Sequence, residues 1–230
     1  MKISNSPGSY GFLAGAYFFL SVLIALALGC AHEKPGASRP DRASRENASV
    51  VIHNICMTTS GLSVGAGSGV MIGKGKVLTA WHVTVCPGFG WHMVVRGQQT
   101  YTARLEKTWV LRDVARLSFT PDFLEPDAPA IAEVRRGQAV CTSVWMPEKK
   151  SACGPVDDRE PLNCPDNEWC TDVRIKFPII AGNSGGPVYN SDGALVALIT
   201  GGGMIRGTKI ALGYGWGTTL WDIRDEIFTK

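Results

Sequence analysis

The chain has 230 residues, of which 45% are hydrophobic and 19% are charged, and its formal net charge is +3. This composition is sufficient for a folded core, and the nearly balanced charge gives no sign of a nucleic-acid-binding protein. The 27 glycines and 13 prolines indicate a fold with many turns. We therefore expect no nucleic-acid partner.

The first 30 residues have the features of an export signal. Lys2 precedes an apolar run from residue 12 to residue 28, which ends in small residues just before Cys30. The run is long for a signal peptide and barely long enough to span a bilayer. Residues 27–30, Ala-Leu-Gly-Cys, also resemble the bacterial lipobox, an imperfect match in which Cys30 would be lipidated. A lipoprotein, a secreted protein and an uncleaved membrane anchor are the alternatives, and each implies export to the periplasm or cell envelope.

Residues 31–49 are small, polar and charged, and they contain two prolines and no apolar period. Such a composition predicts a flexible tether. The folded domain is then expected to comprise residues 50–230.

The cysteine count also favours export. With Cys30 set aside, six of the seven cysteines remain, an even number that allows three disulfides in an oxidising compartment. We expect a Cys56–Cys86 bond, and cross-links within residues 141–170, which hold the other four. Metal binding is the competing interpretation, but no CxxC or HxxxH spacing occurs, so no metal site or cofactor is predicted.

From residue 49 onward, short apolar and β-branched segments alternate with turn signals. Strands are predicted at residues 49–57, 69–72, 76–79, 91–96, 101–105, 115–120, 138–145, 172–177, 186–189, 194–200 and 210–216. Residues 73–75, Gly-Lys-Gly, predict a hairpin, and only residues 219–227 have helical periodicity. This pattern predicts an all-β barrel or sandwich with a short C-terminal helix.

The stretch from Pro147 to Cys170 is the least regular part of the domain. A structureless loop of that length is uncommon in a compact domain unless it is functional or cross-linked. Its three cysteines favour cross-linking, and a position at the rim of a binding cleft is the alternative.

Residues 181–188, Ala-Gly-Asn-Ser-Gly-Gly-Pro-Val, place a single serine among glycines. Glycines permit positive-φ turns that project a hydroxyl while neighbouring N–H groups converge on one point. Hydrolysis at a carbonyl needs that combination of nucleophile and oxyanion donors. A glycine-rich hairpin loop would have the same sequence, so a base and a carboxylate must be found elsewhere to decide.

Two further segments supply them in chain order. Thr79-Ala80-Trp81-His82 is similar to the histidine segment of the chymotrypsin-fold serine peptidases, and Asp113-Val114-Ala115-Arg116-Leu117 to their aspartate segment. Gly182-Asn183-Ser184-Gly185-Gly186-Pro187 is similar to their nucleophile segment. The order His, Asp, Ser is that of this family. Short loops, Gly137-Gln138-Ala139-Val140 and Asp192-Gly193 resemble the exported bacterial members of high-temperature-requirement type.

The resemblance implies two antiparallel six-stranded β-barrels and a serine endopeptidase that acts on proteins or peptides. His82 would be the general base, Asp113 its partner and Ser184 the nucleophile, with the N–H groups of Gly182 and Ser184 as oxyanion donors. Asp122 is an alternative carboxylate, but nearby prolines place it in a loop. His53 and His92 lie in predicted strands and are expected to be structural.

Specificity is also implied by the resemblance. The position six residues before the serine is Pro178, which predicts a primary pocket without a charged floor. Thr200 and Gly201 match the segment that pairs with substrate backbone, so cleavage after small or medium apolar residues is expected. Arg116 replaces an apolar residue of the family, and the strand after Asp113 is therefore expected to be less buried.

Two other functions fit the same sequence. One is a chymotrypsin-fold binding or adaptor lipoprotein that keeps the three residues but has a blocked cleft. The other is a surface lipoprotein in which the motifs are coincidental. Reaction of Ser184 with an active-site probe distinguishes a peptidase from both.

Overall fold

The computed structural model describes residues 48–145, 149–157, 173–204 and 211–229. These residues belong to one compact unit and form an all-β fold with a short C-terminal helix, as predicted. The predicted signal peptide with Cys30, most of the tether, and Cys164 and Cys170 lie outside the described residues. Over the described ranges, no helix has the length and hydropathy needed to cross a membrane.

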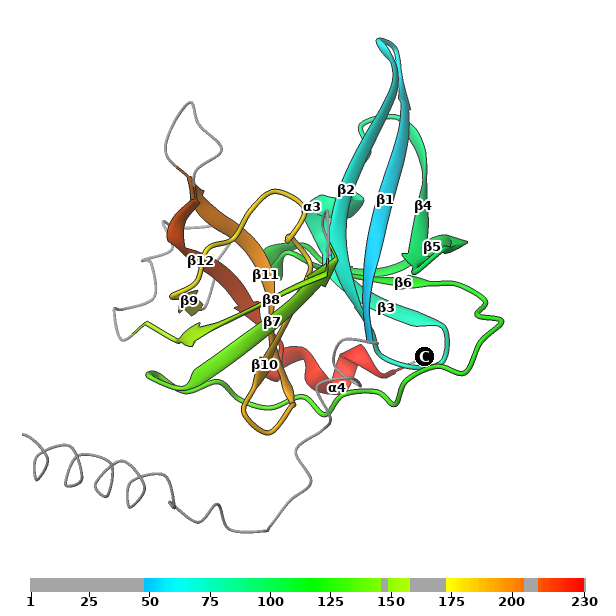
Figure 1. Cartoon of the computed structure of the whole chain (residues 1–230). Coiled ribbons are helices and arrows are strands. Elements are labelled where there is room, and N and C mark those ends of the chain that lie inside the picture. The colour runs from blue at the N-terminus through cyan, green and yellow to red at the C-terminus, as the bar shows by residue number, and fades with distance from the viewer. Residues whose placement is uncertain (1–47, 146–148, 158–172, 205–210, 230) are drawn as a thin grey trace, which may run out of the picture. The chain divides into compact units, whose positions relative to one another are not determined.

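The first six strands close into an antiparallel barrel in the order β1-β2-β3-β6-β5-β4 (Figure 1). They are β1 (Ser49–Thr58), β2 (Gly61–Met71), β3 (Lys76–Ala80), β4 (Phe89–Arg96), β5 (Gln99–Trp109) and β6 (Val114–Ser118). A single helical turn, α3 (Trp81–Thr84), follows β3, and a 3₁₀ turn, η1 (Val110–Arg112), precedes β6. Buried aliphatic side chains such as Ile52, Val77 and Leu117 fill the barrel, because alternate strand residues point inward.

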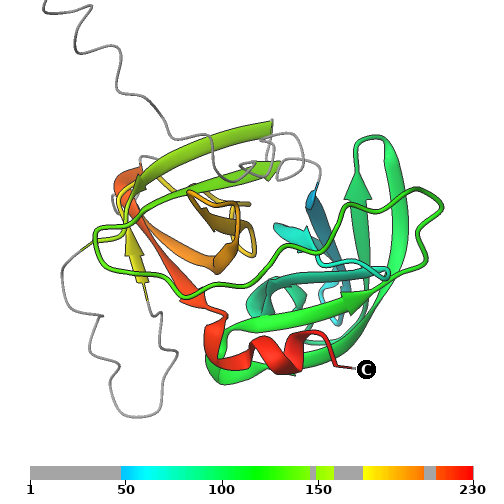
Figure 2. The ribbon, with the colours of Figure 1, turned by 90° about the horizontal axis from the view of Figure 1, so that it is seen from below.

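The second six strands form one curled antiparallel sheet in the order β8-β7-β10-β11-β12-β9 (Figure 2). They are β7 (Ala139–Trp145), β8 (Lys149–Pro155), β9 (Val173–Ile175), β10 (Pro187–Asn190), β11 (Leu195–Met204) and β12 (Ala211–Thr219). An isolated bridge between Val156 and Ile175 joins the two edges of this sheet. The prediction of two six-stranded units is therefore confirmed, with the first closed and the second a half-barrel in the described residues.

A shared apolar core joins the two units and the C-terminal helix. The helix is α4 (Arg224–Ile227), preceded by the 3₁₀ turn η2 (Trp221–Ile223). The cluster draws on both units and on this terminal segment: Val70, Ile72, Leu78, Val114, Tyr189, Leu195, Leu198, Leu220, Ile223 and Ile227. Since all of these side chains are buried, the relative position of the two units is fixed by packing.

The strand after Asp113 is buried, so the expectation that Arg116 would expose it is wrong. Arg116 is only 4% exposed. Its Nη1 donates to the carbonyls of Ile227 and Thr229, each at 2.7 Å, and its Nε lies 3.0 Å from a carboxylate oxygen of Glu106. A buried guanidinium is tolerated here because backbone carbonyls and a carboxylate surround it.

The two longest stretches of strand that were not predicted lie in β8 and in the outer part of β2. The segment Lys149–Pro155, assigned to an irregular loop, forms β8 and pairs with β7 along its full length. The segment Gly61–Ser68 forms the outer part of β2 and pairs with β1. β8 lacks apolar alternation, and in the outer part of β2 the apolar residues Leu62, Val64 and Ala66 alternate only with glycine and serine. Pairing with the partner strand, more than intrinsic propensity, therefore makes both of them strands.

Two disulfides are present among the described cysteines. The Cys56–Cys86 bond is the one predicted, and it links β1 to the segment after α3. The second bond joins Cys141 to Cys153, which face one another across β7 and β8. This second bond lies within the segment expected to be cross-linked.

Candidate active site

Strand register brings His82 and Asp113 together. Ala80 at the end of β3 pairs with Val114 at the start of β6. His82 follows that pair by two residues and Asp113 precedes it by one, so the two side chains meet at the same end of the barrel. Asp113 Oδ2 lies 2.7 Å from His82 Nδ1.

Asp113 also holds the backbone of the histidine segment. Its Oδ1 accepts the His82 N–H at 2.9 Å, and its carbonyl accepts the Trp81 N–H at 2.9 Å. The residue ends η1 in a left-handed conformation with φ 51°, which aspartate tolerates better than most residues. The Asp113 side chain is 7% exposed and the His82 ring 38%, so a buried carboxylate supports a ring that faces solvent.

Ser184 lies in a tight loop between β9 and β10. The Asn183 N–H donates to the Ile180 carbonyl at 3.1 Å, and the Asn183 side chain accepts the Ile180 N–H at 3.0 Å. Gly182, at the third position of this turn, has φ +92°, as a type II turn requires. Gly185 has φ +81°, and a Cβ there would collide with the Ser68 carbonyl and the Thr79 hydroxyl. Glycine is therefore required on both sides of the serine.

The loop is bonded to the first barrel. The Ser68 N–H donates to the Ser184 carbonyl at 2.7 Å, and the Ser68 hydroxyl donates to the Gly182 carbonyl at 2.8 Å. Within the described residues, the N–H groups of Gly182 and Ser184 donate to no acceptor of the chain. Two backbone donors beside the serine hydroxyl are therefore free, as an oxyanion site requires.

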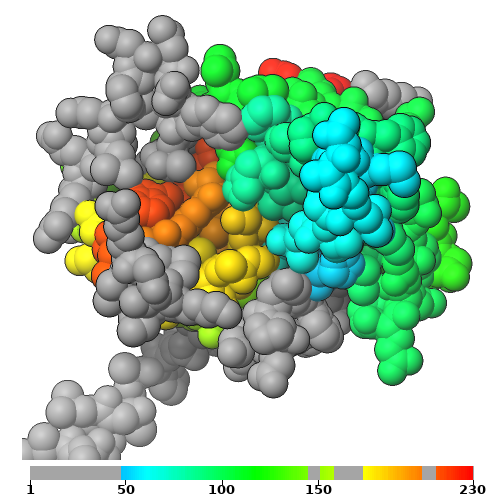
Figure 3. Space-filling view, turned by 90° about the horizontal axis from the view of Figure 1, so that it is seen from above, coloured from blue at the N-terminus to red at the C-terminus, as the bar shows by residue number. Residues whose placement is uncertain are grey.

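His82 and Ser184 line the same surface pocket, which has a volume of about 350 Å³. Its other walls come from β1, from residues 63–66 of β2 and from the segment after α3. Figure 3 views the molecule from the side on which β1 and β2 (cyan) adjoin the segment that carries Ser184 (yellow). All three residues predicted as a catalytic triad thus lie at one junction between the two β units.

The predicted specificity residues do not line the pocket of His82 and Ser184. Gly201 of β11 pairs with Trp216 of β12, and both Gly201 and Thr200 are half-buried. Pro178 is exposed, whereas the next residue, Ile179, is 3% exposed. We therefore find an apolar side chain next to the position that the sequence indicated.

Ile179 packs on two glycines of β11 and β12. Gly202 and Gly215 pair across these strands, and a Cβ on Gly202 would approach the Ile179 Cβ to 2.8 Å. A Cβ on Gly215 would collide with the Ile179 side chain. The sequence reasoning missed Ile179, although the alternation of apolar residues at 177 and 179 predicts that both point inward.

The remaining candidates lie away from the pocket of His82 and Ser184, and Asp122 and His92 have hydrogen-bond partners of their own. Asp122 accepts a hydrogen bond from the Tyr101 hydroxyl at 2.5 Å. Loss of solvent, followed by this hydrogen bond and the Asp122 charge, raises the pKa of Tyr101 to about 12. His92 contacts the Thr84 carbonyl at 3.0 Å, and His53 lies in β1 with Nδ1 buried. In the described part of the chain, no group of three or more His, Cys, Asp or Glu side chains is placed to hold a metal ion.

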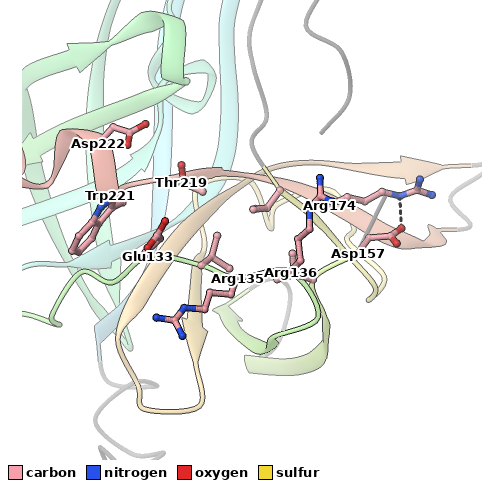
Figure 4. A pocket seen from close by; sticks show the side chains of 11 residues that line it. Glu133, Arg135, Arg136, Asp157, Arg174, Thr219, Trp221 and Asp222 are labelled. Atoms are coloured by element: carbon pink, nitrogen blue, oxygen red, sulfur yellow. Dashed lines mark ion pairs between the residues drawn. The ribbon is translucent and has the colours of Figure 1, made fainter. Parts of the chain in front are cut away.

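A second pocket, of about 300 Å³, lies on the half-barrel (Figure 4). Its labelled side chains are charged residues of both signs with Thr219 and Trp221, and Arg174 is paired with Asp157 at 3.5 Å. It contains no serine, cysteine or histidine among its lining residues. This pocket therefore lacks a nucleophile and base pair, and the pocket of His82 and Ser184 is the candidate active site.

A known protein family matches more than half of the chain. Residues 67–198 match the family model described as a trypsin-like peptidase domain. This range contains His82, Asp113 and Ser184. A search of curated proteins finds no match.

Proposed function

Because the chain belongs to the trypsin-like peptidase domain family, we propose that it is a serine endopeptidase with Ser184 as nucleophile, His82 as general base and Asp113 as the partner of His82. The observation that carries the proposal is the 2.7 Å contact between His82 and Asp113 at a pocket that Ser184 also lines. The buried Asp113 carboxylate supports the role proposed for His82, because a carboxylate beside Nδ1 keeps the proton of the imidazole on that nitrogen.

The reaction proceeds in two stages through an acyl-enzyme. Ser184 Oγ attacks the carbonyl carbon of the scissile bond while His82 Nε2 removes the hydroxyl proton, and the imidazolium is stabilised by Asp113. His82 then donates that proton to the leaving amine as the C–N bond breaks. A water molecule, deprotonated by His82, attacks the acyl carbon and releases the acid, which regenerates Ser184.

The oxyanion of each tetrahedral intermediate is assigned to the N–H groups of Gly182 and Ser184. Their lack of an internal acceptor supports this assignment. The loop is held before substrate arrives, by Asn183 from within and by Ser68 from the first barrel. Donors fixed in advance cost no reorganisation during the reaction, and one such donor contributes roughly 3–4 kcal/mol.

The substrate residue on the acyl side of the scissile bond is proposed to be small and apolar. Thr200 and Gly201 are assigned to the substrate backbone, and the adjoining space between Gly202 and Gly215 already holds Ile179. Ile179 brings no charge and leaves less room than the glycines alone. Alanine or valine fits this site better than lysine, arginine or phenylalanine.

The protein is further proposed to be exported and lipidated at Cys30. Two disulfides among the described cysteines indicate an oxidising compartment, periplasmic or extracellular. The lipobox-like residues 27–30 and the polar residues 31–49 fit a membrane-tethered peptidase domain.

The experiment is labelling of the full chain by a fluorophosphonate, which reacts only with an activated serine. We expect stoichiometric labelling of wild type and none of Ser184→Ala. Asp113→Asn should lower the labelling rate by about 10⁴, because the amide donates to Nδ1 and leaves no acceptor at Nε2. The matched control is Asp122→Asn, which changes the rejected carboxylate and should label at the wild-type rate.

The labelling results distinguish a peptidase from a binding or adaptor protein. Absence of labelling in a folded wild-type protein with both disulfides formed would favour a binding or adaptor protein. Loss of labelling in Asp122→Asn, with Asp113→Asn unaffected, would overturn the assignment of Asp113.

A further inference from the structure

The β1–β2 hairpin and the start of the neighbouring strand β4 carry an exposed apolar face beside the candidate active site. Phe89 is 74% exposed, Leu62 64% and Val64 63%. Figure 1 shows β1 and β2 extending as a long hairpin beyond the other strands of the barrel. A large exposed apolar area on a soluble domain marks an interaction site.

Strand register makes this face continuous. Directly paired residues lie on the same face of a sheet, and the pairs form two adjacent rows across β2, β1 and β4. The rows are Leu62–Met57–Phe89 and Val64–Ile55–Trp91. We call these six side chains the apolar platform. The Phe89 and Trp91 rings, with centroids 6.0 Å apart, contact one another along β4.

The outer part of β2 has a free edge. Over residues 61–68 its strand partner is β1 alone, since β3 pairs only with residues 69–71. The Ser68 N–H points away from β1, to the Ser184 carbonyl. Backbone groups alternate in direction along a strand, so the N–H and C=O groups of Leu62, Val64 and Ala66 also face this edge. Within the described residues, they have no hydrogen-bond partner.

This edge lacks the features that normally prevent strand addition. Exposed edges usually carry charged residues, above all lysine, or proline. Residues 49–73 contain no proline and no Asp, Glu, Lys or Arg, and residues 77–95 contain no such charge either. An uncharged apolar edge promotes aggregation, unless it binds an extended chain as part of its function.

The edge continues into the candidate active site. Ser63, Val64, Gly65 and Ala66 line the pocket together with His82 and Ser184. The β11 segment assigned to the acyl side of the substrate lies across Ser184 from the hairpin, and Figure 3 shows β11 and β12 (orange to red) on the opposite side from β1 and β2 (cyan). When the scissile carbonyl lies at Ser184 and the acyl side of the peptide lies along β11, the leaving-group side therefore extends along the hairpin.

We propose that the leaving-group side of the substrate adds as a strand to the free edge of β2 and places alternate apolar side chains beside Leu62 and Val64. This inference rests on the proposed function and names its substrate class, which is an extended polypeptide with apolar residues C-terminal to the scissile bond. Main-chain hydrogen bonds supply affinity, and the apolar platform supplies selectivity. Folded proteins, in which such segments are buried, are poor substrates.

The test compares two peptides that share one acyl side, ending in Ala-Ala-Val. Their leaving groups are six valines or six threonines, each followed by two lysines for solubility, and mass spectrometry measures only cleavage after Ala-Ala-Val, because the valine run itself contains further bonds that follow a valine. Valine and threonine have the same shape and both favour strands, so only the apolar character differs. We expect kcat/KM to be at least about tenfold higher for the valine peptide.

The variant Leu62→Thr/Val64→Thr should bring this valine-to-threonine ratio below about three. The matched control is Leu124→Thr, which changes a leucine that is 95% exposed but outside the platform and should keep the wild-type ratio. A second readout is fluorescence anisotropy of the labelled peptides on full-length Ser184→Ala, which measures binding without hydrolysis. There too the valine peptide should bind about tenfold more tightly, and Leu62→Thr/Val64→Thr should remove the difference.

Failure of this inference is distinguishable from failure of the proposed function. Hydrolysis of both peptides at equal rates, with equal binding, overturns the platform and leaves the peptidase intact. Tighter binding of the valine peptide without any hydrolysis by wild type overturns the peptidase and supports the platform. A valine preference that persists in Leu62→Thr/Val64→Thr overturns the platform in either case.

Discussion

Asp113 uses each of its carboxylate oxygens for a different bond. One oxygen accepts the backbone N–H of His82 and the other contacts the Nδ1 of its ring. Rotation of the carboxylate would break both bonds, so ring orientation and backbone position are fixed together. The left-handed backbone of Asp113 and its bond to Trp81 hold the carboxylate itself. This arrangement explains why the His82 ring can be half-exposed and still be held in one orientation.

Ile179 is the residue on which substrate size should depend. Ile179→Ala removes the side chain that packs between Gly202 and Gly215 and should admit larger residues. We expect the ratio of kcat/KM for phenylalanine over valine on the acyl side to rise at least about tenfold, since each added methylene in an apolar site changes discrimination about 10-fold or more. Peptide p-nitroanilides that differ at that one residue measure the ratio.

Pro178→Ala is the matched comparison for this prediction. Pro178 stands six residues before the serine but is exposed, so its replacement should leave the ratio within about twofold of wild type. A ratio that changes with Pro178→Ala and not with Ile179→Ala would return the specificity site to the position that the sequence indicated.

At the scale of elements, the C-terminal helix is fastened to the first barrel by polar contacts. Arg116 of β6 binds the carbonyls of Ile227 and Thr229. On the surface, hydrogen bonds from Lys107 and Trp109 lower the pKa of Glu226. A carboxyl whose pKa falls on folding stabilises the fold above its unfolded pKa, and this contribution is lost as pH falls through the lowered pKa.

Arg116→Met tests the buried part of this attachment. The change removes the donor to the buried Ile227 carbonyl and to the Thr229 carbonyl and leaves Glu106 with Lys76 as its cation, so we expect the free energy of unfolding to fall by about 3 kcal/mol. Urea unfolding, followed by tryptophan fluorescence, measures the loss. The control is Arg112→Met, which removes a more exposed ion pair with Asp222 and should cost under about 1 kcal/mol. Equal losses in the two variants would contradict a special role for the buried arginine.

The sequence was sufficient to predict most strands and to single out three residues that the fold brings to one junction, but not the elements that depend on distant partners. Alternation and turn signals predict β1, β3 and the β2–β3 hairpin because these are local patterns. The outer part of β2 and all of β8 were missed, since many of their residues are glycine, serine or lysine, and pairing with β1 or β7 makes them strands. Arg116 is buried because the C-terminal segment packs against β6. This contact joins distant parts of the chain, so no local sequence pattern predicts it.

At the scale of the whole molecule, the site exists only where the two β units meet. His82 and Asp113 come from the first barrel, whereas Ser184 comes from the half-barrel, and the bond from Ser68 to the Ser184 carbonyl crosses between them. The shared core below this junction is buried on both sides. Any loosening of that core would separate His82 from Ser184, so we expect the proposed activity to depend on the stability of the fold.

The two disulfides act at different places in this arrangement. Cys56–Cys86 joins β1 to the segment after α3, and Cys56 lines the pocket of His82 and Ser184. Cys141–Cys153 joins neighbouring strands of the half-barrel. Cross-links of this spacing each contribute on the order of 3 kcal/mol in the chain-entropy account. Folding in an oxidising compartment is therefore part of how the site is held together.

Membrane attachment is the last property that the whole chain should show. If Cys30 is lipidated, wild type will sediment with membranes, and Cys30→Ser will be found mainly in the soluble fraction, because a lipid anchor needs the cysteine thiol. Ala31→Ser, which adds the same hydroxyl one residue later, is the control and should sediment like wild type. Fractionation with immunoblotting measures the distribution, and globomycin, which blocks lipoprotein signal peptidase, should cause the precursor to accumulate. Soluble wild type would indicate plain secretion, and membrane-bound Cys30→Ser an uncleaved anchor. Either result would leave the peptidase proposal unchanged, because Cys30 lies far outside the residues that match the family.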